Sequence, residues 1–177
     1  MKVILKIVLG LIAVAVLFTE VPAQTDHAKE NLPASIKDLR NAPTEIVLDG
    51  RSLSLSAYLW RDFAPGSGDS DRSLMVGLKV ATSDKQAFPG GVRLDRAWVL
   101  FGEQIWEVPP FRGRLKDSPN KERWIKCSDS PVCEAPSARG GPMWSPGVLV
   151  DVVLRLIDKE GQHHLIQAPR QYINAVS

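Results

Sequence analysis

The chain has 177 residues, with 22 basic and 20 acidic side chains and a formal net charge of +2. This length fits one domain with a single core, and the near neutrality argues against a nucleic-acid-binding protein, which normally needs a basic face. Several cations lie between Arg112 and Lys126, but Asp117 and Glu122 interrupt them. We interpret this stretch as a solvated loop.

The first 23 residues have the layout of a secretory signal peptide. Lys2 and Lys6 flank a short charged start, Ile7 to Phe18 is apolar throughout, and Val21-Pro22-Ala23 offers small residues for cleavage. As a helix this apolar run would reach about 18 Å, which is short of the roughly 30 Å hydrocarbon core. We therefore expect cleavage after Ala23 and a secreted or periplasmic protein, with anchoring by an uncleaved N-terminal segment as the alternative.

Cys127 and Cys133 are the only cysteines. Disulfides persist outside the cytosol, and a bond between these two residues would close a small loop. A closed zinc site needs about four ligands, and the chain after cleavage adds only His27, His163 and His164 besides acidic groups. Their spacing also differs from the C-x-x-C of redox pairs. We predict a structural disulfide, no metal site and no cofactor.

Residues 24–43 form a polar stretch before the expected domain. Pro33 and Pro43 punctuate it, and only Ala34 to Arg40 has a weak helical pattern. We expect a flexible N-terminal tether with at most one helical turn.

The domain proper is expected over residues 44–177, starting with a β-hairpin. Asp49-Gly50 separates Thr44–Leu48 from Arg51–Trp60, and Asp-Gly readily adopts the positive φ angles of a type I′ turn. In the second run, leucines and an alanine alternate with three serines and Tyr58. This period of two is typical of a half-buried strand.

The same alternation, bounded by turn residues, predicts further strands. They are Leu74–Val80, Val92–Phe101, Gln104–Val108, Gly147–Ile157, His163–Gln167 and Gln171–Val176. Gly147–Ile157 is apolar on both faces, which indicates a central strand. Pro169 interrupts the last part of the chain, so we expect Gln171–Val176 to be an edge segment.

No period is sustained from about residue 111 to 146, which predicts an irregular insertion with one short strand at Arg123–Lys126. Seven to eight short strands without a long amphipathic helix predict an all-β fold, an antiparallel β-sandwich. The strand spacing resembles an immunoglobulin-like or fibronectin-III-like architecture. The Cys…Trp…Cys spacing of true immunoglobulin domains is absent.

Catalytic motifs are not found in the sequence. It has no G-x-S-x-G elbow, H-E-x-x-H helix or phosphate-binding loop. Asp62, Asp69 and Asp71 are hard oxygen donors, but they do not have the spacing of a calcium-binding EF-hand. We predict that the protein is not an enzyme, and we rank a secreted hydrolase that uses Ser70 or His164 last.

Five tryptophans in a chain of this size form the most informative set of candidate site residues. They are Trp60, Trp98, Trp106, Trp124 and Trp144. Exposed indoles stack on sugar rings or anchor protein interfaces. Trp60 falls on the serine side of its strand. Trp60 and Trp98 are the best candidates for exposure, although we favour packing in the core or at an edge for both. Speculative ligand-binding residues are Trp60, Trp98, Trp106 and Trp144.

These patterns favour an exported, non-enzymatic β-sandwich for protein interaction or envelope structure. Its expected working parts are an exposed sheet edge and the stapled insertion from Phe111 to Pro146. The alternative is a carbohydrate- or small-ligand-binding domain that uses exposed tryptophans. Expected partners are another envelope or secreted protein, or a carbohydrate. Nucleic acid is not expected, and membrane contact is expected only through an uncleaved N-terminal segment.

Overall fold

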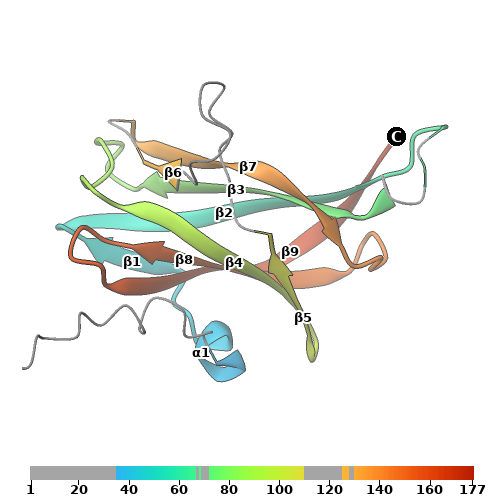
Figure 1. Cartoon of the computed structure of the whole chain (residues 1–177), viewed down its shortest axis with the longest axis horizontal. Coiled ribbons are helices and arrows are strands. Elements are labelled where there is room, and N and C mark those ends of the chain that lie inside the picture. The colour runs from blue at the N-terminus through green and yellow to red at the C-terminus, as the bar shows by residue number, and fades with distance from the viewer. Residues whose placement is uncertain (1–34, 67, 69–71, 110–124, 128–129) are drawn as a thin grey trace, which may run out of the picture. The chain divides into compact units, whose positions relative to one another are not determined.

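The computed structural model describes residues 35–66, 68, 72–109, 125–127 and 130–177. Within these ranges it contains one short helix and nine strands (Figure 1). In chain order they are α1 (Ile36–Arg40), β1 (Glu45–Leu48), β2 (Arg51–Asp62), β3 (Leu74–Thr82), β4 (Arg93–Phe101), β5 (Gln104–Val108), β6 (Ile125–Lys126), β7 (Val132–Gly141), β8 (Leu149–Ile157) and β9 (His163–Val176). In this part of the chain no helix has the length and apolarity to cross a bilayer. The expected signal peptide lies outside the described residues.

The described strands form a curled sheet, which confirms the all-β prediction. Its hydrogen-bonded order is β5-β4-β8-β9-β2-β3-β7, while β1 pairs with β2 and β6 pairs with β4. The nine strands differ from the expected seven to eight because β7 was not predicted, whereas the two strands predicted over His163–Gln167 and Gln171–Val176 form the single strand β9. One pairing also departs from the antiparallel expectation, since β9 runs parallel to β2 with Leu59 opposite Ile173.

Strand β9 links the two halves of the sheet, because its first part pairs with β8 and its last four residues pair with β2. At the change of partner, Arg170 has a φ of 55° and the register with β8 shifts. Pro169 directly precedes this bend and has no N–H for a ladder hydrogen bond. The expectation that Gln171–Val176 is an edge segment is therefore wrong. The bend redirects the strand between two neighbours and does not end it.

The tight turns follow the sequence prediction. Asp49 and Gly50 have φ angles of 47° and 74°, as a type I′ hairpin between β1 and β2 requires. Gly161 has a φ of 81° in the turn between β8 and β9, which confirms the predicted left-handed glycine. Strand β8 lies between β4 and β9 and is largely buried on both faces, as predicted.

Strand β7 is the largest departure from the prediction, because it lies within the expected irregular insertion. It pairs with β3 for most of its length, but the register shifts twice. Pro136 also lies within it. Register shifts and a proline remove the regular alternation that identifies strands in a sequence, and both features are tolerated at a sheet edge. Strand β6 confirms the last two residues of the short strand that the sequence predicts.

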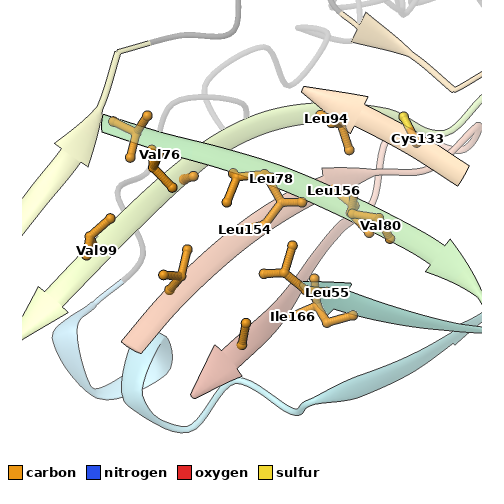
Figure 2. Packing of buried hydrophobic residues seen from close by; sticks show 14 of the residues in the cluster. Leu55, Val76, Leu78, Val80, Leu94, Val99, Cys133, Leu154, Leu156 and Ile166 are labelled. Atoms are coloured by element: carbon orange, nitrogen blue, oxygen red, sulfur yellow. The ribbon is translucent and has the colours of Figure 1, made fainter. Parts of the chain in front are cut away.

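The core lies on the inner face of the curled sheet, where side chains from both halves meet. Figure 2 shows residues of β3 and β8 pointing toward one another in this core. Leu154 and Leu156 of β8 and Val76 and Val80 of β3 have no exposed surface. Burying each such side chain stabilises the folded state by about 1.5 to 3 kcal/mol. This core is therefore the main source of stability.

Two contacts bring β7 next to the opposite end of the sheet, where β5 and β6 lie. We call this region the edge seam; it contains Trp106, Gly141, Cys127 and Cys133. In the first, Trp106 of β5 covers Gly141 of β7. A Cβ atom added to Gly141 would lie 2.8 Å from Leu74 Cβ and from Trp106 Cε3. The indole therefore packs closely here only because position 141 has no side chain.

The second contact of the edge seam is the disulfide between Cys127 and Cys133, whose Cα atoms are 5.1 Å apart. Cys127 directly follows β6, which pairs with β4, while Cys133 lies on β7 opposite Val80 of β3. The two cysteines are six residues apart in sequence. Nevertheless their bond connects β7, at one end of the strand order, to the segment after β6, which pairs with β4 near the other end.

Helix α1 packs on the outer face of the sheet. Its N-terminus has a capping box in which the Ser35 hydroxyl accepts from Asp38 N–H and the Asp38 carboxylate accepts from Ser35 N–H. Leu39 and Ala42 are buried in a second apolar cluster with Trp98 of β4. The sequence places residues 35–43 in a tether, but in the structure they pack against the sheet. The reason is that the side chains of Leu39 and Ala42 cover the indole of Trp98.

Candidate ligand-binding face

The alternation on β2 turns its polar and aromatic side chains away from the core. Leu53, Leu55 and Leu59 are buried on the inner face. On the outer face, Tyr58 is 53% exposed and Trp60 is half-buried. This arrangement follows the period of two in the sequence and places the predicted Trp60 beside the serines, as expected.

Three neighbouring strands carry matching rows of side chains on this outer face. Ser56 of β2 is opposite Lys79 of β3, which is opposite Glu134 of β7. In the next row, Tyr58 is opposite Gly77. An open groove of about 320 Å³ lies over these strands, and we call the surface around it the binding face. The groove is lined by Ser56, Ala57, Tyr58, Gly77, Leu78, Lys79, Glu134, Ala135 and Ser137.

Gly77 lines the groove and leaves a hollow there because it has no side chain. A Cβ atom at this position would meet Trp60 Cζ3 at 3.7 Å and Ser137 Oγ at 3.8 Å, which are ordinary van der Waals distances. Gly77 is also absent from the glycines with positive φ. Neither backbone conformation nor crowding therefore requires glycine in this strand, although glycine weakens strand interiors. Its effect is to leave open space between Tyr58 and Ser137.

Tyr58, which lines the groove, stacks on Trp60. The ring centroids of Tyr58 and Trp60 are 5.3 Å apart, with 30° between the ring planes. Such stacked arrangements contribute about 0.5 to 1.5 kcal/mol beyond area burial. The stacking therefore favours one orientation of the exposed Tyr58 ring beside the groove.

The end of β2 next to this aromatic pair is fastened by Arg61, which is buried. Its Nε donates to the Arg72 carbonyl at 2.7 Å, and its Nη1 donates to the Trp144 carbonyl at 3.0 Å. Its guanidinium also lies 5.1 Å from the centre of the Phe63 ring. These contacts tie the strand to two connecting segments, so the aromatic side chains stand on a rigid support.

The polar part of the groove carries compensating charges. Lys79 Nζ and Glu134 Oε1 are 3.7 Å apart, and both side chains are at least half exposed. The Ser56 hydroxyl donates to the Lys79 carbonyl at 3.3 Å. An exposed pair of this kind contributes little to stability. It leaves the groove without net charge from its lining, which suits a neutral ligand.

Among the described residues, the other predicted tryptophans do not line the groove. Trp98 is buried under α1, and Trp144 is buried and donates from Nε1 to Gln104 Oε1 at 2.5 Å. Trp106 lies at the edge seam, and Trp124 lies outside the described residues. Exposure of Trp98 is therefore wrong, because α1 covers its face of the sheet, while the favoured core packing holds for Trp98 and Trp144.

Sequence reasoning did not name Tyr58 or Gly77 as site residues. The signal for Tyr58 was present, because it falls on the serine side of the alternation together with Trp60. Gly77 gave no signal of its own, because a glycine inside a strand pattern more often marks a bulge or close backbone approach. Its role depends on its neighbours across β2 and β7.

The two adjacent histidines lie at the start of β9, away from the binding face. His163 is exposed, while His164 Nε2 lies 2.7 Å from Asp158 Oδ2. Asp158 also accepts from the N–H groups of Glu160 and Gln162 through Oδ1. His164 is thus engaged in the turn of the β8–β9 hairpin. Among the described residues, no three His, Cys, Asp or Glu side chains are grouped to hold a metal ion, and Ser70 lies outside them.

Asp158 makes the stability of this hairpin dependent on pH. Partial burial acts to raise the pKa of the carboxyl, but hydrogen bonds from His164, Gln162 and Glu160 outweigh it and hold the pKa below the ordinary value of 3.8. The ionised form therefore stabilises the folded state, fully above about pH 4 and progressively less as pH falls through the lowered pKa. We expect Asp158→Asn to cost about 1 kcal/mol at pH 7. Thermal unfolding from pH 7 to pH 2 should show this difference shrinking in acid, and a constant difference would contradict the assignment.

The binding face combines an open groove, an exposed aromatic ring and hydroxyl groups. Its Ser56 hydroxyl donates to a backbone carbonyl, so the described hydrogen bonds do not pair it with a general base. The Tyr58 ring, the hollow and the hydroxyl groups offer stacking and hydrogen bonding instead. No protein-family model, curated protein or solved structure matches this chain.

Proposed function

We propose that this protein is an exported, non-enzymatic β module that binds carbohydrate through the binding face. The observation that carries the proposal is the hollow at Gly77, which lies beside the stacked Tyr58 and Trp60 rings on an exposed surface. Protein interaction, which the sequence patterns favoured first, becomes the second candidate, because the described surface offers a groove sized for a small ring.

Pyranose rings match the chemistry of this surface. Their C–H faces are apolar and stack on aromatic rings, while their hydroxyl groups lie around the rim and form hydrogen bonds. The groove presents Tyr58 for the first kind of contact and Ser137, Lys79 and Glu134 for the second. A shallow, open groove also suits a ligand whose other face stays in water.

The module is proposed to be a β-sandwich with an immunoglobulin-like or fibronectin-III-like arrangement. Support comes from the inner core shared by both halves of the curled sheet and from the change of partner along β9. Export is supported by the predicted signal peptide and by the Cys127–Cys133 disulfide, which is compatible with an oxidising compartment.

Filling the hollow tests the proposed function. We expect Gly77→Thr to lower the affinity for chitobiose or cellobiose at least tenfold, because its side chain would occupy the space for the sugar ring. The variant should be as stable as the wild type or up to about 1 kcal/mol more stable, because threonine suits a strand interior better than glycine. Titration calorimetry measures affinity, and thermal unfolding measures stability.

Gly77→Ala provides the matched control, because its single methyl group meets Trp60 and Ser137 only at ordinary contact distances. Its affinity should fall between those of the wild type and Gly77→Thr. Failure of the wild type to bind either disaccharide and its longer chains would refute carbohydrate binding. Equal affinity of the wild type and Gly77→Thr would show that the sugar binds elsewhere.

Protein interaction remains the second candidate for the same face. The exposed Tyr58 ring favours it, since tyrosine is enriched at protein interfaces. This candidate predicts that saccharides do not compete with a purified protein partner. It also predicts that Tyr58→Ala weakens that partner's binding by at least tenfold.

A further inference from the structure

A third aromatic residue lies on the same outer face, one strand beyond the groove. Leu59 of β2 is paired with Ile173 of β9, and both are buried on the inner face. Successive side chains of a strand point to opposite faces, so the residue before each of them points outward. These residues are Tyr58 and Tyr172, which are 53% and 61% exposed.

The parallel register begins at Leu59 and Ile173, and extending it by one residue places Tyr58 and Tyr172 at the same level on neighbouring strands. A single row therefore crosses four strands, from Tyr172 of β9 through Tyr58 and Gly77 to Ser137 of β7. At about 4.8 Å between strands, the row is about 14 Å long. This length exceeds what one sugar ring covers, and the row runs across the strands.

The junction between β9 and β2 is fixed on this face. Asn174 donates from Nδ2 to the Leu59 carbonyl at 2.9 Å and to the Tyr172 carbonyl at 3.3 Å. The side chain thus bridges the two strands directly beside the tyrosine row. Tyr172 is held on a paired strand and not on a loop, so its position relative to Tyr58 is set by the sheet.

We propose that the ligand is an extended, neutral β-1,4-linked oligosaccharide that lies along this row. The inference rests on the proposed function and names its ligand class. Equatorial linkages keep such chains straight and leave apolar C–H faces on successive rings, so separate rings stack on Tyr58 and Tyr172 while another ring occupies the hollow at Gly77. The compensated Lys79–Glu134 pair fits a chain without charge.

Chain length provides the test. Chitobiose and cellobiose fit the groove at Gly77, whereas chitohexaose and cellohexaose also reach Tyr172. We expect the wild type to bind at least one hexasaccharide at least tenfold more tightly than the matching disaccharide. Tyr172→Ala should remove most of this gain and leave disaccharide affinity unchanged within twofold, whereas Tyr172→Phe, which keeps the ring, should retain the gain. Titration calorimetry gives these affinities.

Ile36→Ala is the matched control, because Ile36 is an exposed apolar residue on α1 at 47% exposure. It should leave both affinities unchanged, and thermal unfolding should show that each variant is folded. If Tyr172→Ala lowers the affinities for disaccharide and hexasaccharide equally, or lowers neither, the extended ligand is overturned. Disaccharide binding that is weakened by Gly77→Thr would then still support the proposed function. Absence of binding to all four saccharides overturns both.

Discussion

Replacing Asp95 by alanine is expected to destabilise the protein by about 3 to 5 kcal/mol, because the change leaves a buried cation without its carboxylate. Asp95 and Arg155 form an ion pair in which the side chains are 4% and 3% exposed. The Arg155 guanidinium also lies 5.9 Å from the centre of the Trp98 ring. Chemical denaturation followed by circular dichroism measures the loss.

A double replacement separates the cost of removing one partner from the value of the pair. Asp95→Leu combined with Arg155→Met removes both charges and keeps apolar volume, so we expect stability close to that of the wild type or above it. Arg96→Met with Glu107→Leu is a control for a partly exposed pair, in which Nη1 and Oε1 lie 3.0 Å apart, and it should change stability by about 1 kcal/mol or less. A loss below about 1 kcal/mol in Asp95→Ala would contradict the role assigned to the buried pair.

Replacing both cysteines by serine is expected to cost about 2 to 4 kcal/mol. The bond closes only a short loop in sequence, and loop entropy for such a loop accounts for about 2 kcal/mol. The remaining cost is expected from the edge seam, because the bond joins β7 to the segment that follows β6. Chemical denaturation of the wild type and the double variant measures the total.

Hydrogen exchange locates the effect of the disulfide. In the double serine variant, amide protection should fall most in β7 and in residues 125–127, while the β8–β9 ladder should retain its protection relative to global unfolding. Wild-type protein kept in reductant should behave in the same way. A uniform fall in protection across all strands would show that the bond stabilises the domain without a particular role at the edge seam.

The parts of this fold that can be predicted are those determined by the local sequence alone. Asp49-Gly50 determines the first hairpin locally, and alternation along β2 identifies its inner and outer faces before any partner strand is known. Strand β7 escapes prediction because Pro136 and two register shifts destroy its period. The parallel pairing of β9 with β2 escapes it as well, since no local pattern records which distant strand becomes a neighbour.

The candidate site also has a part that local sequence predicts and a part that depends on neighbouring strands. Alternation alone places Tyr58 and Trp60 outside the core, and this part was accessible from the sequence. The hollow at Gly77 depends on residues of three strands, and the row to Tyr172 depends on the register of a fourth. Burial of Trp98 likewise depends on α1, which the sequence placed in a tether.

The central place of β9 has a consequence for how the chain reaches its native state. The ribosome makes β9 after every other described strand, yet β9 separates β8 from β2 in the sheet. Until it emerges, β2, β3 and β7 cannot be joined to β4 and β8 through the sheet, and both partial sheets expose unpaired backbone. Assembly of the complete sheet therefore waits until β9 has been made, and the two partial sheets need protection from mispairing until then.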